Sequence, residues 1–466
     1  MFICRKSLFV GQLWACLALI SPCWNGAGWN QAGHARADSP QEVIEAETVI
    51  QTAADRRLHR ILTGRSDKSR NNMIAKLSAA GENVHRDIKV VIQATRDLMQ
   101  QRAAAIDGED DAQPEEISSS VSGLLWVASA SPSPLVESLL IDAVGHADPM
   151  IAMTAMDVVG KLRLDAAVEQ LAEQIKRPIY DQRYAFRFAL IRSIANLHHP
   201  RAVELLGELV GQLDGQLRHE VIERLNEVDV RDFEGDADEL DSWQAAHPIS
   251  DLLDRVYLDV EPEREAVEPA SAIKLKAISS SSQRRPKLAK SQYYGIDLTA
   301  ARMLFIIDNS GSMNEAAHYG TRLQSAKSEL VRTINGLSPD TEFGLMIFDT
   351  TVNMYRDELI PASTENKRDA TTFIERVRSG DRTNTYGALS KATEFDDQLE
   401  AVFVLTDGQP TYGEIKRPDL IIDRIVRRNQ MRHLKFHTIG IGHLGNTAIF
   451  LRTLAEETGG EFRQVP

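Results

Sequence analysis

The sequence predicts a multidomain chain in which an all-α N-terminal part is followed by a doubly wound α/β domain. Two patterns predict this fold class. From about residue 39 to residue 258 apolar residues recur at helical spacing, whereas from Tyr293 onward apolar strands alternate with amphipathic helices. Strands that are apolar throughout are buried on both faces, so they predict a parallel sheet covered by helices. The length of 466 residues also favours two or more domains.

The composition is typical of a soluble globular protein with an acidic surface. Hydrophobic residues make up 43% of the chain and charged residues 26%, and the formal net charge is −14 at pH 7. A chain with this charge repels nucleic acid and anionic membrane surfaces. We therefore expect protein partners and no nucleic acid.

Residues 1–37 are predicted to be a signal peptide. Arg5 and Lys6 form a short basic region, an apolar stretch covers residues 7–20, and Ala35-Arg36-Ala37 fits a cleavage site. The apolar stretch is too short to be a typical membrane span. A signal that stays uncleaved is the alternative, and it is the one route to membrane association that we expect.

All three cysteines lie inside the predicted signal peptide, so the predicted mature chain contains none. That chain cannot use disulfides, thiolate metal ligands or a catalytic cysteine. Cleavage also removes three basic residues and no acidic one, which makes the mature chain more acidic still. An exported chain without cysteine is more typical of bacteria than of animals. We expect it in the periplasm, in the cell envelope or outside the cell.

Two helical regions precede the α/β domain. An acidic break separates an N-terminal helical region (38–116) from a second one (117–258). The second contains three similar helix pairs, in which a small residue such as Gly160 closes one helix and a V-E-x-L helix follows a short turn. This pattern resembles HEAT or armadillo-type repeats over about residues 121–228, which implies an α-solenoid with a concave surface for protein partners. An ordinary helical bundle is the alternative.

A linker is predicted at residues 259–292, because this stretch contains three prolines and a run of four serines. The α/β domain then covers residues 293–466, and we expect Tyr293 to dock the linker onto it. Its predicted strands are 303–307, Glu342–Phe348, Ala401–Thr406, 436–441 and 461–465. Its predicted helices are 323–337, 366–377, 387–393, Pro418–Asn429 and 447–458.

Two acidic residues follow apolar strands of this domain. Asp308 comes directly after the strand 303–307, and Asp407 comes directly after Ala401–Thr406. Ligands of doubly wound sheets bind outside the carboxyl ends of the strands. If these two strands are neighbours, both carboxylates converge at one point, where they repel each other and one pKa rises. A divalent cation would remove that conflict.

Hydroxyl groups accompany the two carboxylates. Ser310 and Ser312 alternate on the loop after Asp308, so both can face the same side, and Thr383 precedes a helix. These ligands are hard oxygens without histidine or cysteine, which favours magnesium, with manganese or calcium as alternatives, over zinc. The chain supplies too few ligands to fill six positions, so water or a partner carboxylate can take one.

These motifs resemble the D-x-S-x-S, threonine and T-D-G elements of von Willebrand factor A (VWA) domains. The resemblance covers about residues 299–466 and implies a Rossmann-like fold whose metal-ion-dependent adhesion site (MIDAS) is completed by an acidic residue of a protein partner. Asp381 and Arg382 depart from the family, where glycines often precede the threonine. The family register favours Thr383 over Thr385 as ligand. The metal ligands that the resemblance implies are Asp308, Ser310, Ser312, Thr383 and Asp407.

We therefore expect a metal-dependent protein-binding protein, an adhesin or scaffold, and not an enzyme. One alternative is a phosphohydrolase-like enzyme, because Asp308 is placed like the aspartyl nucleophile of haloacid-dehalogenase phosphatases. Those enzymes need a second acid where this chain has Ser310, and no general base is placed nearby. The other alternative is a structural envelope protein with an inert site. We expect His437 to pack inside a strand and His443 to lie in a solvated loop.

Overall fold

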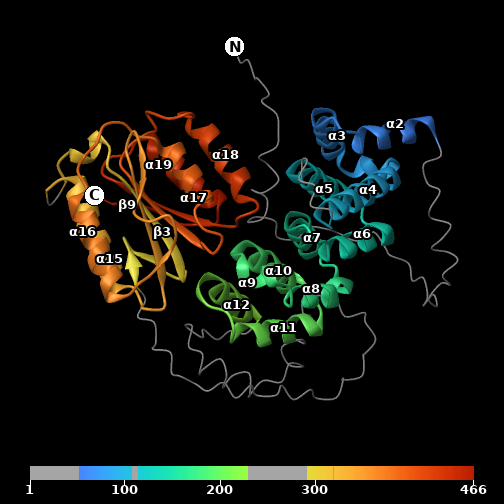
Figure 1. Ribbon diagram of the computed structural model, residues 1–466, viewed down its shortest axis with the longest axis horizontal. Helices are drawn as coiled ribbons and strands as arrows, with labels where there is room; N and C mark the ends of the chain where they lie inside the picture. Colours follow the sequence, from blue (N-terminus) through green and yellow to red (C-terminus); the bar gives the residue numbers. More distant parts are fainter. Residues whose placement is uncertain (1–51, 108–113, 229–290, 318–319, 466) are drawn as a thin grey trace, which may run out of the picture. The chain divides into compact units, whose positions relative to one another are not determined.

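The computed structural model describes residues 52–107, 114–228, 291–317 and 320–465. The chain divides into two compact units, residues 1–158 and 159–466, and the boundary falls inside one helix (Figure 1). The predicted signal peptide and nearly all of the predicted linker lie outside the described residues. No helix in the described part of the chain is long and apolar enough to cross a membrane.

The described residues of the first unit form helices, which confirms the helix-rich N-terminal part. Thr52 and Asp55 form a reciprocal capping box at the start of α2, and Ser133 caps α6 just before Pro134 at its first position. The helices are α2 (Ala53–Leu62), α3 (Asp67–Ala80), α4 (Ile88–Asp107), α5 (Pro114–Ser129), α6 (Pro134–Val144) and α7 (Pro149–Leu162).

The second unit begins with five further helices: α8 (Val168–Gln174), α9 (Pro178–Gln182), α10 (Tyr184–Asn196), α11 (Pro200–Val210) and α12 (Gly215–Val228). Each predicted pair is present as two helices joined by a short connection: α5 with α6, α7 with α8, and α10 with α11. A Cβ on Gly160 would lie 2.9 Å from the Cα of Ser193, so the small residue does permit a close helix approach. The HEAT-like solenoid itself stays a prediction.

A seven-stranded sheet forms the centre of the α/β domain. Its order is β5-β4-β3-β7-β8-β9, and β6 also pairs with β4. All pairings between β4, β3, β7, β8 and β9 are parallel, whereas β5 and β6 run antiparallel to β4. The strands are β3 (Arg302–Asp308), β4 (Glu342–Phe348), β5 (Val352–Met354), β6 (Ile360–Pro361), β7 (Ala401–Thr406), β8 (Lys435–Ile441) and β9 (Phe462–Val465).

Helices cover both faces of this sheet, which confirms the doubly wound α/β architecture (Figure 1). Side chains alternate along β3, so Phe305 joins the core under α15 and α16, and Ile306 joins the core under α17, α18 and α19. The helices are α15 (Arg322–Gly336), α16 (Thr364–Arg376), α17 (Thr385–Thr393), α18 (Pro418–Asn429) and α19 (Asn446–Glu457).

A small hairpin closes one face of the domain. It pairs β1 (Gln292–Tyr293) with β2 (Ile296–Asp297). As expected, Tyr293 packs onto the domain: its ring is buried and meets the edges of Phe305 and Phe403, with ring centroids 5.3 and 6.1 Å away. The start of the α/β domain is therefore fixed by an aromatic contact.

His437 packs inside β8, as the sequence predicted. Its ring stacks on Phe403 at 4.7 Å, and its Nδ1 accepts a hydrogen bond of 3.1 Å from the Glu461 backbone N–H. Burial, helped by the charge of Lys435, lowers the pKa of His437 to about 4. The imidazole is thus neutral in the folded protein at neutral pH.

Acid should destabilise the domain through His437. The unfolded imidazole takes up its proton near pH 6.5 and the folded one only near pH 4. The stabilisation is therefore complete above pH 6.5 and is lost as the pH falls towards 4. Between pH 7.5 and pH 5 we expect this residue to cost about 2 kcal/mol of unfolding free energy.

Denaturant unfolding of His437→Asn at the two pH values checks this expectation, because the variant keeps a hydrogen-bond acceptor but does not titrate. Its unfolding free energy should depend on pH less than that of the wild type. His443→Asn is the matched control, since His443 is exposed in a loop. An equal pH dependence of wild type and His437→Asn would contradict the assignment.

Candidate metal site

The two acidic residues singled out in the sequence lie at the same edge of the sheet. Asp308 ends β3, and Asp407 directly follows β7. The two strands are parallel neighbours, with Ile307 opposite Leu405. Both side chains are buried: Asp308 is 0% exposed and Asp407 6%. The structure thus brings together two carboxylates that are 99 positions apart in the chain.

The loop after β3 wraps around the Asp308 carboxylate. Its Oδ1 accepts a hydrogen bond of 2.7 Å from the backbone N–H of Ser310. Its Oδ2 accepts one of 2.5 Å from the hydroxyl of Thr406, the last residue of β7. These two donors are neutral groups, so they orient the carboxylate without balancing its charge. Thr406, the threonine of the T-D-G element, was not among the predicted ligands, and it holds the Asp308 carboxylate.

Two serine hydroxyls bridge the space between the acids. The Oγ atoms of Ser310 and Ser312 are 3.2 Å apart, and the Ser312 hydroxyl donates to Oδ1 of Asp407 at 2.7 Å. The short 3-10 turn η6 (Gly311–Asn314) sets this spacing. As predicted, both hydroxyls lie on the side of the loop that carries the carboxylates.

The loop that carries Thr383 lies against the loop after β3. The Gly311 backbone N–H donates to the carbonyl of Asp381 at 2.8 Å. Thr383 is buried, and its backbone N–H donates to the hydroxyl of Thr411 at 2.9 Å. Its carbonyl accepts from the backbone N–H of Thr411 at 3.0 Å, so the segment after β7 holds this loop in place.

Thr385, the competing threonine, is the first residue of α17. Its hydroxyl is buried and has no hydrogen-bond partner among the residues that the structure describes. The choice of Thr383 over Thr385 as the ligand stays a prediction.

The electrostatics of the site favour a bound cation. Burial raises the pKa of Asp308 to about 7, with a further contribution from the nearby charge of Asp407 and an opposing one from the hydrogen bonds of Thr406 and Ser310. A carboxylate that is costly to ionise in this environment gains when a positive charge arrives.

Arg322 is a basic residue of the site that the sequence analysis missed. It is the first residue of α15. One guanidinium nitrogen donates to Oδ2 of Asp407 at 2.8 Å, and the other lies 2.9 Å from the carboxylate of Glu315. No local motif connects Arg322 to Asp407, because they are 85 residues apart. The one hint in the sequence is that Arg322 follows the loop of Ser310 and Ser312 closely along the chain.

Comparison with known proteins identifies the domain that carries this site. Residues 303–409 match the family model described as von Willebrand factor type A domain. The chain contains a VWA domain.

Curated relatives match this part of the chain. The human inter-alpha-trypsin inhibitor heavy chain H4 is 29% identical over 182 residues, which are 37% of this chain and 19% of the relative. Heavy chain H3 of Mus musculus is 27% identical over 183 residues, which are 37% of this chain and 20% of the relative. The chain thus spans about a fifth of the length of these relatives.

Solved structures also match part of the chain. A von Willebrand factor type A protein from Catenulispora acidiphila is 19% identical, with a TM-score of 0.30, and the match covers 37% of this chain and 40% of the other. Proximal thread matrix protein 1 of the mussel byssus, with a zinc-occupied MIDAS motif, is 20% identical with a TM-score of 0.28. That match covers 35% of this chain and 41% of the other.

The residues of the VWA domain fit a small hard cation. Among the described residues no group of three or more histidine, cysteine, aspartate or glutamate side chains could hold a metal. The site instead combines two buried carboxylates with serine and threonine hydroxyls. This oxygen set suits magnesium better than zinc, and it leaves coordination positions for water or for a ligand from outside.

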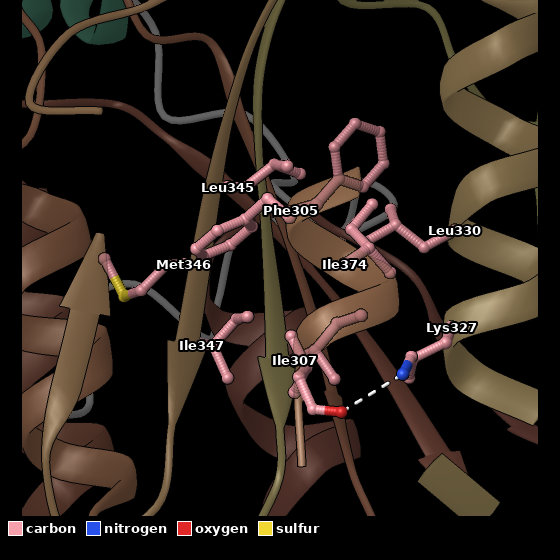
Figure 2. A pocket seen from close by; sticks show the side chains of 10 residues that line it. Phe305, Ile307, Lys327, Leu330, Leu345, Met346, Ile347 and Ile374 are labelled. Carbon is pink, nitrogen blue, oxygen red and sulfur yellow. Dashed lines mark hydrogen bonds between the residues drawn. The ribbon is translucent and has the colours of Figure 1, made fainter. Parts of the chain in front are cut away.

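A pocket elsewhere in the VWA domain belongs to its core. It lies between β3, β4, α15 and α16, and Figure 2 shows Phe305, Leu330 and Ile374 on its walls. The charged side chain of its lining, Lys327, donates to the carbonyl of Val377 at 3.1 Å. Its wall is otherwise apolar, so the pocket offers little to a polar ligand.

The departures from the family pattern lie on the rim of the site. Asp381 and Arg382 are exposed, and the Arg382 guanidinium stands 5.7 Å over the ring of Tyr412. His443 is exposed in the loop after β8, as expected. Neither Arg382 nor His443 replaces one of the predicted ligands.

Proposed function

We propose that the VWA domain binds a protein partner in a metal-dependent manner. The observation that carries this proposal is the convergence of two buried carboxylates, Asp308 and Asp407, joined through the serine hydroxyls at the carboxyl ends of β3 and β7. The proposed ligands are Asp308, Ser310, Ser312, Thr383 and Asp407. The proposed cation is magnesium, with manganese or calcium as alternatives.

The protein groups have separate roles in this proposal. Thr406 and the Ser310 backbone N–H orient the Asp308 carboxylate. Asp407 and the hydroxyls complete the oxygen cage on the chain's side. A bound divalent cation supplies an open coordination position with a positive charge, which an acidic residue of the partner can fill. The loops at the sheet edge then form the surrounding contact surface.

The rest of the chain is assigned a supporting role. We propose that residues 38–116 and the HEAT-like residues 117–258 act as a scaffold or second binding surface, joined through the linker 259–292 to the VWA domain. The matched relatives include inter-alpha-trypsin inhibitor heavy chains, which is compatible with an exported protein. Export to the periplasm, envelope or exterior through residues 1–37 remains part of this proposal.

An enzyme is the weaker alternative. A phosphohydrolase would use Asp308 as a nucleophile, but Asp308 is 0% exposed and both its oxygens accept hydrogen bonds. Ser310 occupies the position where such an enzyme needs a second acid. An inert structural site is the other alternative, and it predicts partner binding that ignores chelators.

Metal titration tests the proposal. We expect magnesium and manganese to bind the predicted mature chain saturably in calorimetry. Asp407→Ala should weaken binding by about 100-fold or more, because loss of even an outer-shell partner costs 10- to 100-fold. Thr383→Val should also weaken binding. Thr385→Val separates the two threonines, because its buried hydroxyl makes no hydrogen bond among the described residues: weaker binding in this variant and not in Thr383→Val would assign the ligand to Thr385.

The same proteins can be used in a pull-down of the partner with and without chelator. A partner that is retained by the wild type, but not in the presence of chelator or by Asp407→Ala, would support metal-dependent recognition. A wild-type chain that binds neither metal would sink the proposal and move the search to the helical part. Phosphoester turnover that disappears in Asp308→Asn would instead favour the enzyme.

A further inference from the structure

Arg322 is built into the metal site from outside the predicted ligand set. It begins α15 directly after Thr321, whose side chain caps the helix in a reciprocal pair with Gln324. Its side chain is 14% exposed, so most of it is withdrawn from water. The guanidinium spans the buried Asp407 and the more exposed Glu315. A capped helix start thus delivers a positive charge to one acid of the site.

The backbone around Arg322 is shaped to hold this guanidinium. Gly442 has a φ of +81°, and a Cβ there would come within 2.8 Å of Nε and 3.0 Å of Cζ of Arg322. A side chain at this position would press on the guanidinium, and the left-handed φ itself favours glycine. Gly442 directly follows β8, the strand next to β7, so the cradle belongs to the same sheet edge as Asp407.

The two acids of the site therefore have different hydrogen-bond donors. Both oxygens of Asp407 have a donor: Oδ1 the Ser312 hydroxyl, and Oδ2 the Arg322 guanidinium. Asp308 accepts hydrogen bonds from two neutral groups, the Ser310 N–H and the Thr406 hydroxyl. Without a metal, one acid is neutralised by a cation from the chain and the other is not.

We propose that Arg322 is a resident cation that stabilises the metal-free VWA domain and lowers its affinity for divalent metal. This inference rests on the proposed metal site. A guanidinium within hydrogen-bond distance of one ligand carboxylate repels an incoming divalent cation and occupies an oxygen that could serve it. The site then binds metal only at ion concentrations high enough to offset the repulsion by the Arg322 guanidinium.

Arg322→Gln tests the inference, with metal affinity and metal-free stability as separate readouts. The Arg322 guanidinium contacts Asp407, a proposed ligand of the ion. Removing its positive charge should therefore tighten magnesium and manganese binding by about tenfold or more. In chelator the variant should melt at a lower temperature than the wild type, because Asp407 loses its partner. The metal-induced rise in melting temperature should be larger than in the wild type.

Two further variants separate charge from shape. Arg322→Lys keeps the charge, so its metal affinity should stay close to that of the wild type. Arg332→Gln removes an exposed arginine on the same helix, which pairs with Glu329, and should leave metal affinity unchanged. If Arg322→Gln does not fold, Arg322→Met keeps the aliphatic stem and replaces it in the comparison.

The outcomes distinguish this inference from the proposed function. Tighter metal binding in Arg322→Gln than in the wild type, with wild-type affinity in Arg322→Lys, supports the inference. Unchanged or weaker binding in a folded Arg322→Gln overturns it and makes Arg322 a residue that positions Asp407. Absence of binding in both the wild type and Arg322→Gln overturns the proposed metal site, and the inference falls with it.

Discussion

Asp308→Asn is expected to make the metal-free protein more stable and to abolish its metal binding. The carboxylate is fully buried, and burial raises its pKa from 3.8 to about 7. At pH 8 it is ionised in both the folded and the unfolded protein, so the folded protein bears the cost of the buried charge. Asparagine keeps the shape and can still accept from the Ser310 N–H. We expect a gain of about 2 to 4 kcal/mol in unfolding free energy.

The sign of the pH dependence follows from the same pKa. An acid whose pKa is raised by folding loses its proton first in the unfolded chain, so stability falls as the pH rises from about 4 to about 7. The Asp308→Asn variant lacks this dependence. The unfolding free energy of the variant should therefore exceed that of the wild type only slightly near pH 4 and most at pH 8. With metal present the wild type should be more stable than Asp308→Asn, because only the wild type gains binding energy.

Denaturant unfolding at pH 5 and pH 8, with chelator or with magnesium, measures both effects. Asp340→Asn is the matched control, since Asp340 is an exposed acid at a distance from the site in sequence. It should change neither stability nor metal response. A metal-free Asp308→Asn protein that is less stable than the wild type at pH 8 would show that the carboxylate is structural.

Glu400→Ala is expected to destabilise the second unit by about 3 to 5 kcal/mol, the usual result of removing one partner of a buried ion pair. Glu400 directly precedes β7 and is 0% exposed. It accepts from the backbone N–H of Gln216 in α12 at 2.8 Å and of Ala301 at 3.1 Å, and it pairs with Arg302 at 2.7 Å. Alanine would leave the two backbone N–H groups without this acceptor, whereas Arg302 would keep its ion pair with Asp214.

This case differs from Asp308→Asn in two ways. Alanine keeps neither the shape nor the acceptors of the side chain. Glu400 also has a cationic partner, Arg302, whereas the donors to Asp308 are neutral. Burial raises the pKa of Glu400 to about 7, so the measurement belongs at pH 8, where the carboxylate is ionised. Loss of the backbone acceptor should also loosen α12 from the start of β3 and β7.

Urea unfolding gives the change in free energy, and hydrogen exchange at the Gln216 and Ala301 amides localises it. Glu394→Ala is the control: Glu394 forms an exposed ion pair with Arg428, and its loss should cost less than about 1 kcal/mol. If Glu400→Ala costs no more than this control, the buried network is not a stabilising contact between α12 and the VWA domain.

Local patterns in the sequence were sufficient to predict most of the α/β domain. The strands Glu342–Phe348 and Ala401–Thr406 and the helix Pro418–Asn429 were predicted with the observed bounds. Wholly apolar strands and amphipathic helices leave a strong local signal. The antiparallel strands β5 and β6 were missed, because they have only three and two residues and lie half-exposed at an edge of the sheet. Short edge strands carry no such periodicity.

The sequence by itself determined the chemistry of the candidate site. Asp308 and Asp407 directly follow buried strands, and parallel strands of a doubly wound sheet end at one edge. The hydroxyl residues sit in the adjoining loops. Strand ends and residue types are local properties, so the convergence of acids and hydroxyls at this edge of the sheet could be predicted before any contact was known.

Only the tertiary structure decided which distant residues control those acids. Thr406 holds Asp308, Arg322 neutralises Asp407, and Glu400 joins α12 to the opposite ends of β3 and β7. Each of these contacts joins residues 85 or more positions apart, and none follows from periodicity or spacing. Charge pairing inside a protein depends on which elements pack together, because burial makes an ion pair strong only where the fold excludes water.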